Sequence, residues 1–248
     1  MDSSDPELAA APAVQRRFRR ALNYSVVAVA VLCLAFLGQA QFGDIRAFTI
    51  QPQVAAGLLG VLTAPLLHGS LGHLAANALS ILILGTLAGT VYPRATLRAL
   101  PLIWIGSGLG TWLIATGGFH LGASGISHGL GFLLFTLGVL RRDRPAIAAA
   151  LIAFFFFGGM LMTILPQEMG VSWEYHLAGA VMGVLAGIVW RRADPMPARH
   201  RYSWELEAET PVEADGNLEL PRPEQIPVIW HRQDRPGVVL PFRRPPTG

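Results

Sequence analysis

Six long apolar segments dominate the chain and restrict it to folds that a lipid bilayer can hold. They cover residues 21–37, 73–91, 97–116, 124–140, 146–165 and 173–190. A helix needs roughly 20 apolar residues to cross the hydrocarbon core of a bilayer, so the segments predict an all-α membrane protein with six transmembrane helices. A further apolar stretch, residues 54–67, is broken by Pro65 and fits either an interfacial helix or an early part of the second span.

The charge distribution points to the same class of protein. Charged residues make up 14% of the chain, against roughly a quarter in soluble domains, which disfavours a water-soluble fold. The net charge is +3, and its arginines stand beside the apolar segments. This position favours membrane topology over nucleic-acid binding, so no nucleic-acid partner is expected. Cys33 is the single cysteine, which excludes an intrachain disulfide.

Arginines occur at every second junction between the predicted spans. They are Arg16, Arg17, Arg19 and Arg20 before the first span, Arg94 and Arg98 after the second, Arg141, Arg142 and Arg144 after the fourth, and Arg191 and Arg192 after the sixth. Because basic residues remain on the cytoplasmic side, both termini are predicted to be cytoplasmic. The expected organisation is an N-terminal arm over residues 1–20, a membrane domain over 21–191 and a Pro-rich tail over 192–248, whose composition predicts disorder.

Three of the spans begin with polar residues at one depth. With both termini inside, the second, fourth and sixth spans all start at the outer face. Their first turns contain His73 with Asn77, then Ser124, then His176. At a rise of 1.5 Å per residue, these four side chains lie in the outer part of the membrane. Polar groups at membrane depth are costly and mark functional sites, so we expect the four to form one site.

The residue types in this set suit attack by a serine nucleophile. His73 and Asn77 are four residues apart and therefore share a helical face, where both can donate hydrogen bonds to a developing oxyanion. Ser124, in the run Gly122-Ala123-Ser124-Gly125, stands at a helix start where backbone N–H groups have no intrahelical partner. A serine needs a base to take its proton, and His176 is the candidate base.

Glycines on two of the spans predict close helix packing. Gly125 and Gly129 form a small face on the fourth span, and Gly179 and Gly183 form another on the sixth. Small residues let transmembrane helices approach until their backbones touch. The fourth and sixth spans are therefore expected to pack directly against each other.

Missing residue types exclude several other mechanisms. The chain has no lysine, which excludes a Ser–Lys dyad, and no aspartate within the six segments, which excludes a paired-aspartate protease. It has no H-E-x-x-H motif and no histidine set with the carboxylates or thiolates that zinc prefers, so no metal site is expected. Glu174 is two residues from His176 and faces elsewhere on the helix, which favours a Ser–His dyad over a triad.

The serine motif and the remaining histidines also fit structural roles. A lone G-x-S-G string in a chain with 27 glycines is weak evidence, so the prediction depends on order, spacing and shared depth together. His68 is expected to brace the loop before the second span, and His120 is expected to face water. His128 lies four residues after Ser124 and is expected to contact or tune His176, with a role as the base itself as the less favoured alternative.

In these motifs the sequence resembles the rhomboid family of intramembrane serine proteases, over residues 48–190. The likeness rests on the run His68-Gly69-Ser70-Leu71-Gly72-His73 followed by Asn77, on Gly122-Ala123-Ser124-Gly125, and on His176-Leu177-Ala178-Gly179 followed by Gly183. The resemblance implies a six-helix rhomboid-like bundle with Ser124 as nucleophile and His176 as base. It also implies an oxyanion and substrate-binding site at His73, Asn77, Gly122 and the backbone N–H of Ser124.

The resemblance carries further expectations about partners and location. Rhomboids cleave other membrane proteins within or near their transmembrane helices and need no cofactor. The implied substrates are therefore transmembrane-helix proteins in the lipid bilayer, and the implied location is the bacterial plasma membrane.

Three positions depart from the family's usual pattern. His128 stands where the family often has a tyrosine that stacks on the catalytic histidine. The Trp-Arg pair common in the first outer loop is absent, with only Arg46 nearby, and that loop is predicted to be short. Tyr175 precedes His176 where a small residue is common, and is expected to narrow access to the site.

Two other classes of function stay open. A catalytically silent rhomboid-like protein would bind membrane clients without cutting them, although loss of the serine or histidine, its expected signature, is not found here. A small transporter or channel would have paired charges or broken helices near the bilayer midplane, whereas these polar residues lie at outer helix ends. The sequence predicts neither a natural substrate nor an oligomeric state.

Overall fold

The computed structural model describes residues 6–142, 144–166, 170 and 172–196. Within them the chain is helical and has no strand, apart from an isolated bridge between Ile50 and His120. The predicted tail from residue 197 onward lies outside the described residues.

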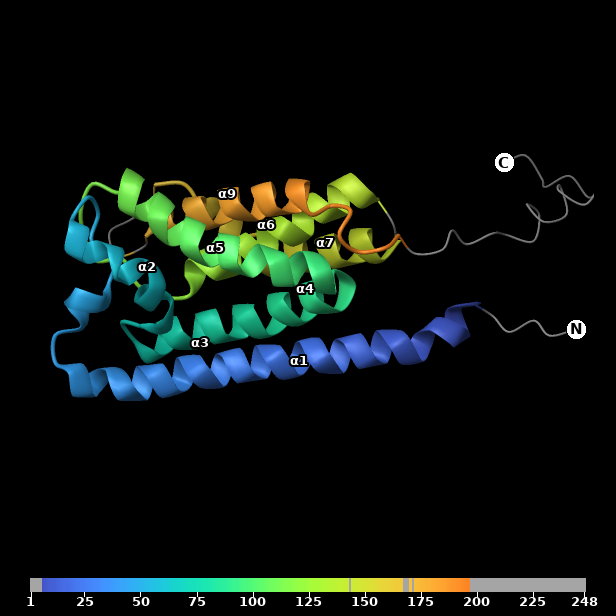
Figure 1. Cartoon of the computed structure of the whole chain (residues 1–248), viewed down its shortest axis with the longest axis horizontal. Helices are drawn as coiled ribbons and strands as arrows, with labels where there is room; N and C mark the ends of the chain where they lie inside the picture. Colours follow the sequence, from blue (N-terminus) through green and yellow to red (C-terminus); the bar gives the residue numbers. More distant parts are fainter. Residues whose placement is uncertain (1–5, 143, 167–169, 171, 197–248) are drawn as a thin grey trace, which may run out of the picture. The chain divides into compact units, whose positions relative to one another are not determined.

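Figure 1 labels the helices in the order in which they occur along the chain. The first is α1 (Pro6–Gln39), and the connection after it contains η1 (Ala40–Phe42), η2 (Ile45–Phe48), η3 (Ala55–Leu58), α2 (Gly60–Thr63) and η4 (Ala64–Leu66). A continuous helix then runs through α3 (Leu71–Ser80), the π-helical turn η5 (Ile81–Gly85) and α4 (Thr86–Val91). The remaining helices are α5 (Pro93–Ile114), α6 (Ser124–Arg141), α7 (Arg144–Phe157), α8 (Met160–Thr163) and α9 (Trp173–Val189).

Four helices in the described residues are long and apolar enough to cross a bilayer. They are Pro12–Phe42, Leu71–Val91, Pro93–Ile114 and Ser124–Arg141, and shorter apolar helices cover Ala55–Leu66, Pro145–Phe155 and Trp173–Val189. The prediction of an all-helical integral membrane protein is therefore confirmed, while the count of six spans stays a prediction. Large apolar side chains are exposed on the helices, including Leu37 of α1 and Phe155 of α7, as expected of surfaces that face lipid.

The first connection is longer than predicted. It runs from Ala40 to Ser70, because residues 55–66 form three short helical pieces that are separate from α3. Trp104 of α5 donates a hydrogen bond from Nε1–H to the carbonyl oxygen of Leu62, at 3.3 Å. Thr63 also donates one to the carbonyl oxygen of Phe48, at 2.7 Å. The expectation of a short first loop is thus wrong, since the apolar stretch folds onto α5 and does not lengthen the second span.

The predicted fifth span is not one helix. α7 ends at Phe157, and the chain then turns through Gly158 and Gly159 into the four-residue α8. The turn is held by tight bonds three residues apart, from the N–H of Leu161 to the oxygen of Gly158 and from the N–H of Met162 to that of Gly159, both at 3.1 Å. Glycine weakens a helix interior, and hydropathy alone did not register this break.

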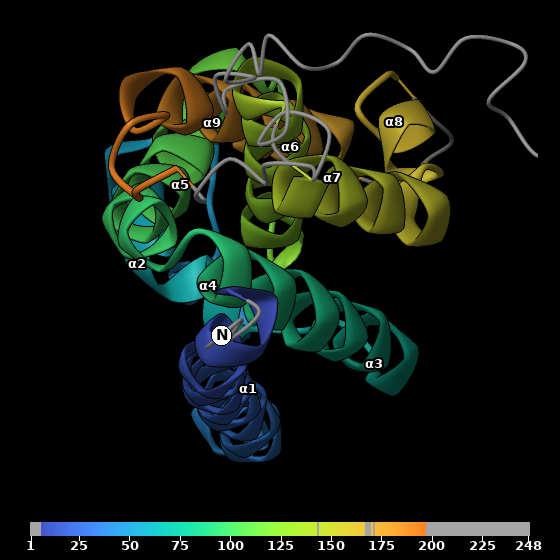
Figure 2. The same ribbon diagram turned by 90° about the vertical axis from the view of Figure 1, so that its right-hand side faces the viewer.

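Helix α6 is the centre of the bundle. It packs against α5, α7 and α9, and the end-on view shows it among them (Figure 2). Leu130, Leu133, Leu134 and Leu137 of α6 are buried in one cluster with Ile103 of α5.

Glycines bring α6 and α9 into backbone contact. A side chain at Gly179 would collide with the carbonyl of Gly125, and one at Gly183 would collide with the carbonyl of Gly129. Their missing side chains let the two helices approach directly.

The segment after α9 is fastened to the start of α5 and to the end of α6. The Asp194 carboxylate is 6% exposed and accepts hydrogen bonds from the backbone N–H groups of Arg94 and Ala95, at 3.0 and 2.9 Å. Arg141 donates to the carbonyl oxygens of Arg191 and Asp194, at 3.0 and 2.9 Å. The predicted domain boundary at residue 191 is thus too early for the fold, which continues through this clamp.

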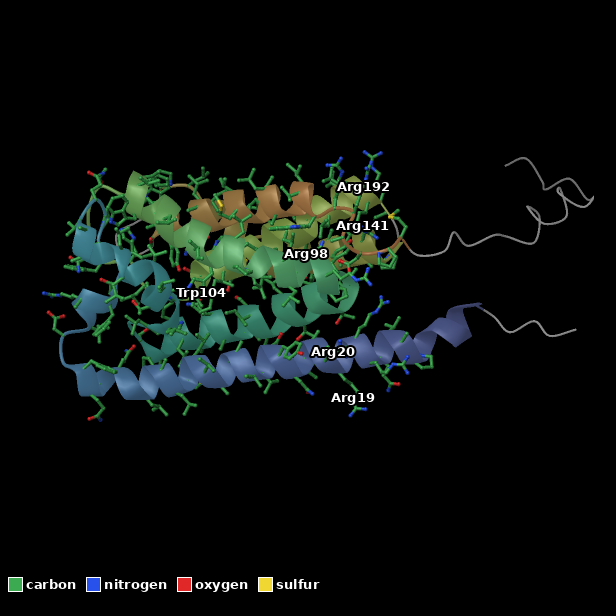
Figure 3. All side chains as sticks on the ribbon, in the orientation of Figure 1. Arg19, Arg20, Arg98, Trp104, Arg141 and Arg192 are labelled. Atoms are coloured by element: carbon green, nitrogen blue, oxygen red, sulfur yellow. The ribbon has the colours of Figure 1, made fainter. Side chains whose placement is uncertain are left out.

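Arginines gather toward the end of the bundle that holds this clamp. Figure 3 shows Arg19, Arg20, Arg98, Arg141 and Arg192 toward that end. The starts of α3, α6 and α9 lie at the opposite end (Figure 1).

The tight packing around α6 makes a prediction for two of its glycines. Gly129→Ala places a methyl group into Ile103, and such overpacking costs about 1–3 kcal/mol. At Gly131 the added carbon meets only Leu84 Cδ1 at 3.8 Å, so Gly131→Ala is expected to be neutral or to stabilise by about 0.5–1 kcal/mol. Thermal unfolding in detergent micelles measures both. Equal melting temperatures for the two variants would contradict the packing described.

The Asp194 clamp generates a second stability prediction. Asp194→Ala removes the acceptor for two N–H groups at the start of α5, of which that of Ala95 is buried, and is expected to cost about 1–2 kcal/mol, as for a lost helix cap. Asp44→Ala is the matched control, because Asp44 accepts a single bond from the N–H of Arg46 in an exposed position and should change stability by less than about 0.5 kcal/mol. Unfolding in detergent again provides the measurement. A cost for Asp44→Ala as large as that for Asp194→Ala would rule out the capping role.

Candidate active site

Ser124 is the first residue of α6, and the loop before it is fixed by two tethers. His120 exchanges both backbone hydrogen bonds with Ile50, each at 3.0 Å, and the N–H of Gly122 donates to the oxygen of Ala64 at 2.9 Å. Gly122 has φ +106°, a backbone conformation that glycine alone adopts at little cost. The backbone hydrogen bonds of this irregular loop are thus made with the equally irregular first connection. These bonds hold Ser124 at the start of α6.

His73 and Asn77 of α3 lie beside this loop. A side chain at Gly122 would come within 2.5 Å of His73 Nε2 and 3.3 Å of Asn77 Nδ2, so the two polar groups occupy the space that the glycine leaves. The start of α3 is capped by Ser70, whose Oγ accepts from the N–H of His73 at 3.1 Å. Asn77 is buried, and its Nδ2 has no hydrogen-bond partner in the described part of the chain. An amide donor is therefore available beside Gly122, which stands two residues before Ser124.

His176 of α9 is placed by stacking on α6. Its ring lies against that of His128, with centroids 4.0 Å apart and planes 13° apart. One turn further along α9, Gly179 touches the carbonyl of Gly125. His176 therefore lies alongside the first turn of α6, which begins at Ser124.

Thr163, at the end of α8, contacts both stacked rings. The Nδ1–H of His176 donates to the Thr163 carbonyl oxygen at 3.1 Å, because a carbonyl can only accept. The Thr163 hydroxyl lies 2.9 Å from His128 Nε2, and the other ring nitrogen of His128 donates to the carbonyl oxygen of Ser124 at 2.7 Å. With Nδ1 protonated, neutral His176 has its lone pair on Nε2.

Comparison with known protein families identifies one that covers this region. The Rhomboid domain family matches residues 55–193, which is more than half of the chain. The chain belongs to the rhomboid family. It is 42% identical over 146 residues to an uncharacterized protein of Mycobacterium tuberculosis strain H37Rv, covering 55% of this chain and 61% of that protein. An uncharacterized protein of Mycobacterium leprae is 36% identical over 139 residues, covering 52% of this chain and 55% of that protein.

The structure brings the polar residues at the starts of α3, α6 and α9 to one end of the bundle. His128 contacts His176, as expected of a residue at that position. Thr163 is the contact that sequence reasoning missed. A threonine in an apolar segment carries no distinctive signal, and its position depends on the turn at Gly158 and Gly159.

Two other histidines of the rhomboid domain are buried. The expectation that His120 faces water is wrong, because its side chain is 7% exposed and its ring contacts the Ser172 hydroxyl and the Gly117 carbonyl oxygen. Burial lowers its pKa. His68 braces the loop through its backbone, whose N–H and carbonyl both bond the side-chain amide of Gln39, at 3.2 and 2.7 Å.

The His68 ring also reaches the site. It packs edge-on against His73, with ring centroids 5.2 Å apart. Burial, together with the charge that His73 can carry, lowers the pKa of His68 to about 4. The ring is therefore neutral at physiological pH and adds no positive charge beside His73.

Tyr175 takes a packing position. It is completely buried, with Ile50 and Ala64 in its cluster. A side chain at Gly125 would come within 2.6 Å of its ring. Tyr175 therefore fills the space between α9 and α6. The expectation that it narrows access to the site is wrong, because its ring is packed inside the bundle.

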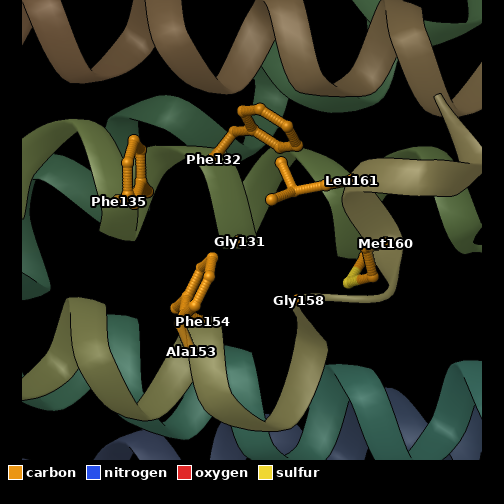
Figure 4. Close-up of a pocket in the computed structure, with 8 residues that line it drawn as sticks. All are labelled: Gly131, Phe132, Phe135, Ala153, Phe154, Gly158, Met160 and Leu161. Carbon is orange, nitrogen blue, oxygen red and sulfur yellow. The ribbon is translucent and has the colours of Figure 1, made fainter. Parts of the chain in front are cut away.

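An apolar cavity of about 80 Å³ lies between α6 and the α7–α8 turn (Figure 4). It is lined by Gly131, Phe132, Phe135, Ala153, Phe154, Gly158, Met160 and Leu161. Phe132 is one turn of α6 beyond His128, so the cavity adjoins the stacked histidines. Among the described residues, no three His, Cys, Asp or Glu side chains gather in a way that would hold a metal ion.

Proposed function

We propose that this rhomboid protein is an intramembrane serine endopeptidase, with Ser124 as nucleophile and His176 as base. The observation that carries the proposal is the hydrogen bond from His176 Nδ1–H to the Thr163 carbonyl oxygen. This bond selects the tautomer in which Nε2 has a lone pair, and the stack on His128 holds that ring beside the start of α6. A correctly protonated base next to a serine at a helix start is what acyl transfer requires.

The proposed reaction follows from these positions. Ser124 Oγ attacks the carbonyl carbon of the scissile peptide bond while its proton moves to His176 Nε2. The imidazolium then gives that proton to the leaving amine, and the C–N bond breaks to leave an acyl-enzyme. Water attacks the ester with His176 again as base, which releases the new carboxyl end and restores Ser124.

The proposed oxyanion site uses three N–H donors, from Asn77, Ser124 and His73. Asn77 Nδ2 is buried and unpartnered within the described residues, and a helix start leaves the N–H of Ser124 without an intrahelical acceptor. His73 lies beside Gly122 and completes the set. Donors fixed before the reaction stabilise the tetrahedral oxyanion without reorganising.

The proposed substrates are membrane proteins with a transmembrane helix that reaches this end of the bundle. The arginine-rich end lies opposite, which supports cytoplasmic termini and a site in the outer half of the membrane. The mycobacterial relatives support a bacterial plasma membrane, although the chain covers 61% or less of their length. The proposed chemistry needs no cofactor.

The main test compares the wild-type protein with Ser124→Ala and His176→Ala in liposomes. Wild type is expected to cleave a reporter transmembrane helix and to label with a fluorophosphonate, and both variants are expected to lose cleavage by about 10³-fold or more. Ser127→Ala is the matched control, because Ser127 is a buried serine in the same turn region of α6 that has no role in the reaction.

The outcomes separate the candidate functions. A wild-type protein that binds reporters but neither labels nor cleaves them would establish the catalytically silent client binder instead. Cleavage by Ser124→Ala at the wild-type rate would exclude Ser124 as the nucleophile.

Asn77→Ala tests the oxyanion site separately. Loss of one oxyanion donor is expected to lower kcat by about 10²–10³-fold. Because the amide donor has no partner among the residues that the structure describes, the variant should unfold at a temperature no lower than wild type. Cleavage kinetics and thermal unfolding in detergent measure the two effects. A lower melting temperature together with the loss of cleavage activity would assign Asn77 a structural role instead.

A further inference from the structure

We propose that the Thr163 hydroxyl is a positioning group that keeps His128 neutral while the stacked His176 receives the serine proton. The inference rests on the proposed function of Ser124 and His176. It concerns Thr163, the last residue of α8, whose side chain contacts His128.

The hydrogen bonds of His128 determine its protonation. Nδ1 lies 2.7 Å from the Ser124 carbonyl oxygen, so Nδ1 carries a proton and donates it. Nε2 is then the only basic nitrogen of the ring. It lies 2.9 Å from the Thr163 hydroxyl, which can donate its proton to the Nε2 lone pair.

The hydroxyl has a second acceptor within reach. Thr163 Oγ1 lies 2.9 Å from the carbonyl oxygen of Met160, and one hydroxyl proton serves one strong acceptor at a time. If the proton turns to Met160, Nε2 of His128 must itself be protonated to bond the hydroxyl oxygen. Thr163 thus has two arrangements, and the one directed at Nε2 corresponds to a neutral His128.

The stack makes this choice matter for the reaction. The two rings are face to face with centroids 4.0 Å apart, and like charges at such a separation oppose each other's ionisation. The catalytic cycle places a positive charge on His176 as it takes the serine proton. A charged His128 would oppose that step, whereas a neutral ring presents its face to the imidazolium.

Thr163 also connects the two rings by position. Its carbonyl oxygen accepts from His176 and its hydroxyl contacts His128, so one residue contacts both rings. A carbonyl and a hydroxyl here do the orienting work that a carboxylate does in a catalytic triad.

The test is a double-mutant cycle between Thr163 and His128. Thr163→Val keeps the shape and the carbonyl but removes the hydroxyl, and it is expected to lower kcat about tenfold with little change in KM. Thr163→Ser restores the hydroxyl and should restore kcat. In the His128→Phe background, which keeps a stacking ring without Nε2, Thr163→Val should have no further effect on kcat.

A matched control removes a similar hydroxyl elsewhere. Thr90 of α4 donates from Oγ1 to the carbonyl oxygen of Thr86, at 2.6 Å, a backbone acceptor of the kind that Met160 offers to Thr163. Thr90→Val is expected to leave kcat unchanged. A wild-type kcat in Thr163→Val would overturn the proposal, because the hydroxyl would then have no effect on the reaction. An equal loss of kcat in the His128→Phe background would also overturn it, because the hydroxyl would then act without His128 Nε2.

A readout independent of activity separates this inference from the proposed function. In protein with ¹⁵N-labelled histidine, assigned with the His128→Phe variant, Thr163→Val is expected to shift the Nε2 signal of His128 and to leave its Nδ1 signal protonated. An inactive wild type would refute the protease assignment alone. An unchanged Nε2 signal in Thr163→Val would refute the role of Thr163, whether or not the protein cleaves.

Discussion

The contact between the backbones of α6 and α9 sets the geometry of everything around it. In lipid, helices gain little from burying apolar surface against each other, so close van der Waals packing between small residues must hold them. Gly179 against Gly125 and Gly183 against Gly129 provide that packing. A larger residue at these positions would separate the helices by more than the spacing that ring stacking allows. The stack of His128 on His176 depends on this approach.

A second constraint is that irregular backbone must be satisfied inside the membrane protein itself. The loop before Ser124 meets this requirement by bonding to the first connection through Ile50 and Ala64. Each of the two irregular segments supplies acceptors for the N–H groups of the other. The start of α6 thus has a fixed geometry although an irregular loop precedes it, and Ser124 is held in place.

Much of this arrangement was predictable from the sequence because topology converts distant residues into neighbours. Basic junctions gave the expected direction of each span, and direction placed His73, Ser124 and His176 at one end. The packing of α6 against α9 was also predictable, because small residues at helical spacing in a membrane protein usually mark close helix packing.

The parts that were not predictable depend on individual hydrogen bonds and turns. Hydropathy treats Gly158 and Gly159 as continuing an apolar run, so the break after α7 and the position of Thr163 were missed. The burial of His120 depends on pairing with Ile50, which is 70 positions away in the sequence. Composition placed a boundary near residue 191, whereas one carboxylate three residues later extends the fold.

Asp194 also determines the order in which the bundle is completed. Its partners, the N–H groups of Arg94 and Ala95, precede it by 100 and 99 positions. At synthesis rates of about 5–20 residues per second, these groups wait roughly 5–20 s for their acceptor after they leave the ribosome. The first turn of α5 therefore matures after α9 has been made, and nascent chains released before residue 194 have this end of the domain open.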